Sequence, residues 1–90
     1  MNTILIYSTD ANLMYNSYKL IAVCSTKQKA IELLTPHLEK EAIENFKEDG
    51  YNNSNRMLSD LIYSLNSINQ TQSLEKNFVF ETIENNKISF

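Results

Sequence analysis

Apolar residues recur three and four positions apart between Met57 and Ile68, and no other feature of the sequence constrains the fold as strongly. This stripe consists of Met57, Leu58, Leu61, Ile62, Leu65 and Ile68. Apolar residues at this period predict an amphipathic helix that buries one face. The rest of the chain must therefore supply apolar surface against which that face can pack.

A second helical pattern precedes this stripe. Its apolar residues are Ala30, Ile31, Leu34, Leu38, Ala42, Ile43 and Phe46. Ser25 is expected to cap its first turn, and Pro36, which lacks an amide proton, predicts a break or kink within it. Gly50 is expected to end it, because glycine tolerates the left-handed backbone that follows many helices. Ser54 or Asn55 is then expected to cap the second helix.

Three segments rich in β-favouring residues predict strands. They are Thr3–Ser8, Tyr18–Cys24 and Phe78–Ile83. Asn85 and Asn86 can supply a tight turn, after which Lys87–Phe90 is predicted as a short fourth strand. The order β-β-α-α-β(-β) predicts a single α+β domain over residues 1–90, in which two to three helices pack on one face of a small antiparallel sheet.

The length of the chain limits the core that it can build. A chain of 90 residues buries only about 60–65% of the surface that its unfolded form exposes. Small domains of this kind often gain stability from disulfides, metals or self-association. Cys24 is the only cysteine and His37 the only histidine, which excludes an internal disulfide and disfavours a zinc site. We therefore expect no metal and expect a homo-oligomer.

Charge and hydropathy exclude several classes of partner. The formal net charge is -3, with eight basic against eleven acidic residues, and this balance offers no basic stripe for duplex nucleic acid. No segment approaches the ~20 apolar residues of a membrane span. The first residues lack the basic region of a signal peptide, and with the lone thiol of Cys24 this favours the cytoplasm. One glycine cannot build a Gly-rich phosphate loop, and no cofactor is expected.

The candidate binding residues lie in two polar segments. Residues 9–17 connect the first two strands and are longer than the two to five residues of a usual hairpin loop. Long loops often carry function. If the third strand pairs antiparallel with the first, it brings residues 70–72 beside this loop, and the two segments form one rim. The predicted ligand- or partner-binding residues are Thr9, Asp10, Tyr15, Asn16, Ser17, Tyr18, Gln70, Thr71 and Gln72.

Each of these residues also has a structural interpretation. Asp10 follows a strand, where carboxylates often bind ligands or act in catalysis, but an aspartate in such a turn usually accepts hydrogen bonds from loop amides. Tyr15 and Tyr18 suit stacking on a base or contact with a protein, and packing at a sheet edge explains them equally well. Residues 70–72 offer amides and a hydroxyl for recognition, or they cap the helix before them.

Segments that span most of the chain carry a family resemblance. They are Tyr7–Ala11, Lys19–Cys24, Gln70–Gln72 and Asn77–Glu81. Together they resemble small uncharacterised proteins of phages and mobile elements of gut bacteria. Such proteins often carry an aromatic residue and a histidine soon after the Thr-Asp-Ala of residues 9–11, where this chain has Asn12–Met14, so their chemistry is not carried over. The resemblance implies a phage-type accessory protein in a bacterial host and implies no mechanism.

We therefore expect a protein that acts by binding and is not an enzyme. Its expected partner is a host protein or a small nucleotide-like ligand, as for a host-defence antagonist that binds a host protein or sequesters a nucleotide signal. Two alternatives stay open. One is a structural or assembly subunit that forms a homo-oligomer. The other is a small enzyme that uses Asp10 with the hydroxyl of Thr9 or Ser17.

Overall fold

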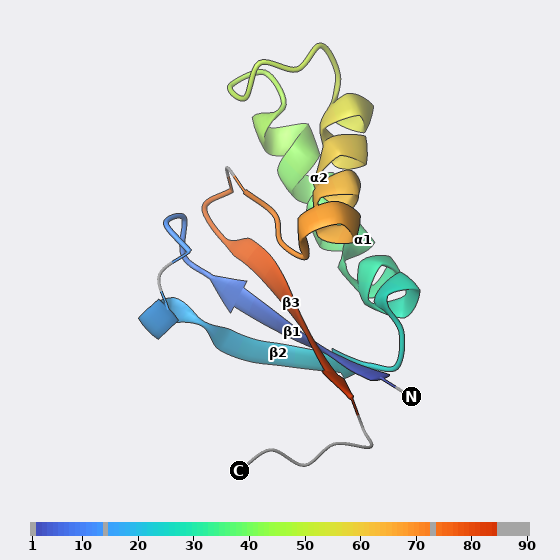
Figure 1. The fold of residues 1–90 in the computed structure, drawn as a ribbon. Coiled ribbons are helices and arrows are strands. Elements are labelled where there is room, and N and C mark those ends of the chain that lie inside the picture. Colours follow the sequence, from blue (N-terminus) through green and yellow to red (C-terminus); the bar gives the residue numbers. More distant parts are fainter. Residues whose placement is uncertain (1, 14, 73, 85–90) are drawn as a thin grey trace.

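The chain folds in the predicted order, as seen in a computed structural model that describes residues 2–13, 15–72 and 74–84 (Figure 1). Its elements are β1 (Asn2–Thr9), the short 3-10 helix η1 (Tyr15–Ser17), β2 (Lys19–Cys24), α1 (Lys27–Asn45), α2 (Ser54–Ile68) and β3 (Asn77–Glu84). Within these ranges, two α-helices and an antiparallel sheet make an α+β fold, which confirms the predicted class. The predicted fourth strand, Lys87–Phe90, lies outside the described residues.

β1 lies at the centre of the sheet and pairs antiparallel with both neighbours, in the order β2-β1-β3. Side chains alternate across a strand, and Ile4 and Ile6 of β1 are buried on the side that the helices occupy. Phe80 of β3 lies opposite Ile6 and is buried with it. The register between β1 and β2 shifts between Ile6 and Tyr7, so that Ile21 of β2 has no partner on β1.

Both helices lie on the same side of the sheet (Figure 1), with α1 against β1 and β2 and α2 packed on α1. The core consists of Ile4, Ile6, Ala30, Leu34, Leu38, Ala42, Met57, Leu61, Leu65, Leu74 and Phe80. The apolar stripe of α2 is buried at every fourth position, at Met57, Leu61 and Leu65, whereas Ile68 at its end is half-exposed. The spacing in the sequence therefore identified the buried face of this helix.

α1 runs without interruption through Pro36, so the predicted break is wrong. The helix also begins one residue later than predicted, because Thr26 is its cap: the Thr26 hydroxyl accepts a hydrogen bond from the amide of Lys29 at 3.1 Å. Pro36 removes one hydrogen bond from the helix interior. Leu34 and Leu38, on either side of it, are buried in the core, and this packing outweighs the local preference of proline.

α1 ends at Asn45, earlier than predicted, and Gly50 ends the turn that follows it and not the helix itself. Gly50 has a φ of 84°, in the left-handed region that glycine enters without a steric penalty. The amide of Tyr51 then donates to the carbonyl of Phe46 at 2.8 Å and that of Gly50 to Lys47 at 3.2 Å. This pair of bonds is the usual way in which a glycine closes a helical segment.

Two asparagines set the ends of α2. Asn53 caps its first turn by accepting a hydrogen bond from the amide of Arg56 at 2.9 Å, one residue before the predicted caps, Ser54 or Asn55. Asn69 has a φ of 62° and ends the helix. Asparagine tolerates this left-handed conformation better than most residues, and the chain turns there toward β3.

Replacing Pro36 tests how much the interior proline costs. Pro36→Ala restores an amide donor within α1, and proline in a helix interior is about 3 kcal/mol less favourable than alanine. Alanine also gives the unfolded chain more freedom, so we expect the free energy of unfolding in urea to rise by about 1–2 kcal/mol. His37→Ala, at the exposed neighbouring position, should change it by less than about 0.5 kcal/mol. A loss of stability in Pro36→Ala would contradict this account.

Candidate functional site

The pairing of β1 with β3 brings the two predicted segments together. Thr9 at the end of β1 lies opposite Asn77 at the start of β3. The side-chain amide of Asn77 donates to the carbonyl of Ala11 at 3.5 Å. The loop after β1 therefore lies beside the segment that enters β3 (Figure 1), as the antiparallel arrangement predicts.

Asn77 is the centre of this junction and is fully buried. Its Oδ1 accepts from the Thr71 hydroxyl at 3.0 Å and from the amide of Leu74 at 3.3 Å, and its Nδ2 donates to the carbonyl of Leu74 at 3.2 Å. The Thr71 hydroxyl also accepts from the amide of Phe78 at 2.9 Å. Thr71, which the sequence offered as a binding residue, is fully buried and fixes the entry to β3.

The loop after β1 is shaped by its own hydrogen bonds. The Asp10 carboxylate accepts from the amide of Asn12 at 3.0 Å, which is the turn geometry expected of an aspartate here. The Asp10 amide donates to the Ser17 hydroxyl at 3.0 Å and closes the loop. Thr9 is buried, and its hydroxyl donates to the carbonyl of Asp10 at 2.9 Å. Thr9 and Asp10 thus hold the backbone of the loop.

The other predicted residues separate onto different surfaces. Gln70 forms a bridge to Val79, along the outer side of β3. Gln72 is exposed and lines a hollow of about 240 Å³ beside α2. Asn16 is exposed in η1. Tyr15 belongs to η1 by its backbone, and its side chain lies outside the described part of the structure.

The hollow beside α2 contains a tyrosine–aspartate contact. The Tyr51 hydroxyl donates to the Asp60 carboxylate at 2.8 Å. This hydrogen bond, together with burial and the negative charge of Asp60, raises the pKa of Tyr51 above its ordinary value of 10.0, because all three favour the neutral phenol. The contact joins the turn after α1 to α2 and stabilises their arrangement.

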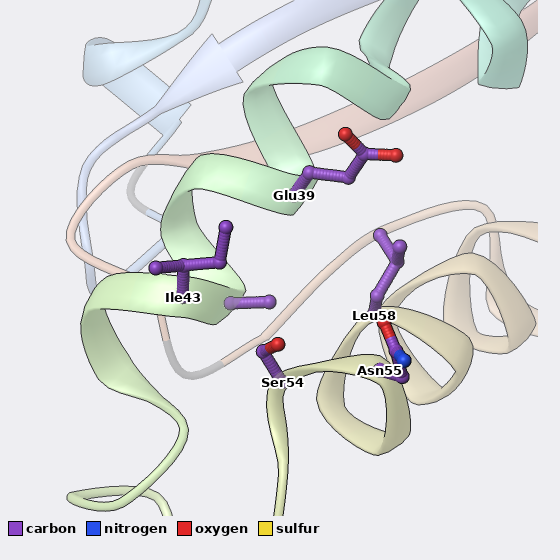
Figure 2. Close-up of a pocket in the computed structure, with 6 residues that line it drawn as sticks. Glu39, Ile43, Ser54, Asn55 and Leu58 are labelled. Carbon is purple, nitrogen blue, oxygen red and sulfur yellow. The ribbon is translucent and has the colours of Figure 1, made fainter.

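A second hollow, of about 280 Å³, lies between α1 and α2 (Figure 2). Glu39 and Ile43 flank it from α1, and Ser54, Asn55 and Leu58 flank it from α2. Among the described residues, every buried side-chain nitrogen and oxygen already has a hydrogen-bond partner. Among the described residues that line this hollow, no buried polar side-chain atom lacks a hydrogen-bond partner and needs a ligand to supply one.

The strongest candidate surface is the side of the sheet opposite the helices. Tyr7 of β1 lies between Leu20 of β2 and Val79 of β3 in the register, and the ring of Tyr18 packs against that of Tyr7 with centroids 5.7 Å apart. Neither α1 nor α2 covers this side (Figure 1). We name this surface the open face. The register and the ring contact assign to it Thr3, Leu5, Tyr7, Tyr18, Leu20, Val23, Val79, Glu81 and Ile83.

Apolar side chains dominate the open face. Val23, Leu20 and Ile83 leave 58%, 50% and 41% of their surface exposed. Exposed apolar side chains gathered on one surface commonly mark a contact with another molecule. Of the residues on this surface, only Tyr18 was predicted from the sequence as a binding residue. A signal for the others is that the second and third strands carry apolar residues on both sides, although the helices of a chain this short can cover only one side.

The helix side of β2 is also apolar and incompletely covered. A hollow of about 390 Å³ lies there between β2 and α1. It is lined by Ile21, Ala22, Leu33, Leu34, His37 and Phe78. Ile21 and Leu33 each expose about half of their surface. β2 therefore carries exposed apolar side chains on both sides of the sheet.

Comparison of the chain with protein-family models, curated proteins and solved structures finds no match. Within the described ranges, no three or more His, Cys, Asp or Glu side chains gather in a way that could hold a metal ion. No helix in that part of the chain combines the length and the apolar character needed to cross a membrane.

Replacing Asn77 tests whether it holds the loop after β1 to β3. Asn77→Ala leaves the buried groups around it without partners, which costs about 1–3 kcal/mol. We expect the free energy of unfolding to fall by that amount and the amides of Thr71 and Leu74 to exchange faster with deuterium. Asn66→Ala, on the exposed side of α2, should change stability by less than about 0.5 kcal/mol. If both variants are equally stable, Asn77 does not organise the junction.

Proposed function

We propose that this chain is a small phage-type accessory protein that acts by binding a host protein through its open face. The observation that carries the proposal is the gathering of exposed apolar side chains around the Tyr7–Tyr18 pair, on the side of the sheet that neither described helix covers. The partner is a protein whose own contact surface is apolar at its centre. By binding there, the chain would cover a functional surface of that partner.

The composition of the open face supports a protein contact. Tyrosine contributes a large contact area with few rotatable bonds and a hydroxyl for a hydrogen bond, and it is enriched where interfaces are strongest. The register also places the polar residues Thr3 and Glu81 on the open face, with Glu81 of β3 opposite Leu5. Interfaces between proteins usually combine apolar and polar side chains.

The fold also gives this surface a fixed shape. The open face is built on paired strands, and the loop that carries Tyr18 is closed by the Asp10–Ser17 hydrogen bond. A surface that is preorganised loses less conformational entropy when it binds. Under this proposal the predicted loop residues Thr9, Asp10 and Ser17 position the contact residues.

A small nucleotide-like ligand is the second candidate, and the tyrosine pair is the observation that favours it. Aromatic rings stack on nucleic-acid bases of every kind, and the ring of Tyr18 packs against that of Tyr7. The formal net charge of -3 opposes the phosphates of such a ligand. The apolar side chains of the open face extend well beyond the area of one base, so a protein partner accounts for more of the surface.

The proposal assigns the protein to the cytoplasm of a bacterial host. Thiols remain reduced in that compartment, and Cys24 is a free thiol. The proposal needs no acid or base, and it gives the Asp10 carboxylate the role of accepting the amide hydrogen of Asn12. An enzyme that depends on Asp10 would need that carboxylate for proton transfer as well.

Photocrosslinking in bacterial cells tests the proposal. A benzophenone amino acid replaces Tyr18 on the open face or, as the matched control, Tyr63, which is the more exposed tyrosine and lies on α2. We expect position 18 to give one covalent adduct of defined mass that is not a multiple of the chain's own mass. Position 63 should give none. Ile83, also on the open face, is the second labelling site if the Tyr18 variant does not fold.

Three results would count against a protein partner. Adducts at neither open-face position, or at position 63 as strongly as at position 18, would remove the open face as the binding surface. A nucleotide-sized mass retained by the purified chain in native mass spectrometry would replace the protein partner with a small ligand.

A further inference from the structure

We propose that two copies of the chain associate through the outer edge of β2, antiparallel about a two-fold axis, to form one continuous sheet. Each copy contributes three strands in the order β2-β1-β3, and the two copies of β2 become the central pair. This inference rests on the edges of the sheet and on both sides of β2. It does not depend on the identity of the partner proposed for the open face.

The two edges of the sheet differ in how they are protected. Along the first half of β3, the chain itself covers the edge: the amide of Thr71 donates to the carbonyl of Phe78 at 2.9 Å, and the amide of Phe80 donates to the carbonyl of Asn69 at 2.7 Å. The second half of β3 carries Glu81 and two further polar or charged residues, Thr82 and Glu84. Backbone cover and charge are the usual means by which proteins prevent an edge strand from pairing.

β2 has neither kind of protection in the part of the chain that the structure describes. It is the other edge strand of the sheet, contains no proline, and carries a single charge, on Lys19 at its start. Leu20, Ile21 and Val23 expose 50%, 45% and 58% of their surface. An apolar edge strand of this kind is a template for pairing with another strand.

The pattern of apolar side chains along β2 is symmetric about the midpoint between Ile21 and Ala22. Leu20 and Val23 belong to the open face, and the bulge places Ile21 with Ala22 beside the hollow on the helix side. Antiparallel pairing centred between Ile21 and Ala22 therefore sets Leu20 opposite Val23 of the second copy, and each Ile21 opposite an Ala22. A two-fold interface requires this self-complementarity, and each match is an apolar cross-strand pair.

The single charge of β2 does not oppose this pairing. In the register described, each Lys19 lies opposite Cys24 of the second copy. The two lysines are then five residues apart along the central pair, or about 17 Å at the usual rise of a strand. Charges at this distance are largely screened at physiological salt. Pairing of β3 with its copy would instead bring the carboxylates of Glu81 and Glu84 together.

The hollow between β2 and α1 adds a second layer to the contact. Ile21 and Leu33 line it and are half-exposed. Because α1 packs against β2, the two-fold axis brings the same apolar side chains of the second copy to this hollow. The association thus covers exposed apolar groups on both sides of the new central strands. A foreign strand without an accompanying helix would cover only the edge.

Sedimentation velocity with charge variants tests this inference. Over about 1–100 μM, where weak to moderate dimers dissociate, the chain should pass from monomer to dimer and no further. Leu20→Glu or Val23→Lys places a charge in two symmetry-related apolar pairs, and each should raise the dissociation constant by about tenfold or more. The double variant sets each new carboxylate opposite a new ammonium group and should recover affinity relative to both single variants.

Ile43→Lys is the matched control, because Ile43 is also an exposed apolar residue but lies on α1 at the hollow between the helices. It should leave the dissociation constant unchanged. Circular dichroism checks that each variant is folded, and deuterium exchange of the wild-type chain gives a second measure, in which the amides of β2 become more protected as concentration rises.

A chain that remains monomeric at about 100 μM, with β2 exchange independent of concentration, overturns the inference. So does a dimer that Ile43→Lys weakens as much as Leu20→Glu, or one that the double variant fails to recover. If β2 becomes protected only when another protein is added, its occupant is a foreign strand and not a second copy. The crosslinking test at Tyr18 separates the two proposals, because an adduct with a second copy has twice the mass of the chain and an adduct with a host protein does not.

Discussion

The sheet has two sides, and the described chain has helices for only one of them. α1 and α2 share one apolar core with Ile4, Ile6 and Phe80, and this core is the main source of stability in a chain of 90 residues. The strands nevertheless carry apolar residues on both sides. The side left uncovered is the open face, on which the proposed binding function rests. The proposed self-association rests on the unprotected edge of β2.

The polar residues serve this arrangement by fixing the shape of one end of the sheet. Buried Asn77 joins the entry of β3 to Thr71 and to the loop after β1. Because a buried amide is costly unless all its hydrogen-bonding groups are satisfied, the junction has one favoured geometry. The loop after β1 is itself closed by the Asp10–Ser17 hydrogen bond and leads to Tyr18, whose ring packs against Tyr7 on the open face. The two apolar surfaces, one on the open face and one along β2, therefore meet on a rigid framework.

Local patterns in the sequence predicted the elements and their order. The helical period of apolar residues and the β-propensity of a segment depend on neighbouring residues, and both are visible in the sequence. They also predicted that the loop after β1 meets the segment before β3, since antiparallel pairing requires it. They failed at Pro36, where packing of Leu34 and Leu38 outweighs a local preference. They could not reveal that Thr71 is buried or that Leu20 and Val23 are exposed, because exposure depends on which side of the sheet the helices cover and on the bulge at Ile21.

The most direct test of this account compares the two sides of the sheet in solution. Methyl relaxation by a soluble paramagnetic reagent reports exposure at Val79 and Ile83 on the open face and at Ile4 and Ile6 on the helix side. The account predicts strong relaxation at the first pair and little at the second, because only the second pair is buried under the helices. Equal protection of all four residues in the isolated chain would contradict it, since the open face would then be covered and unable to bind a partner.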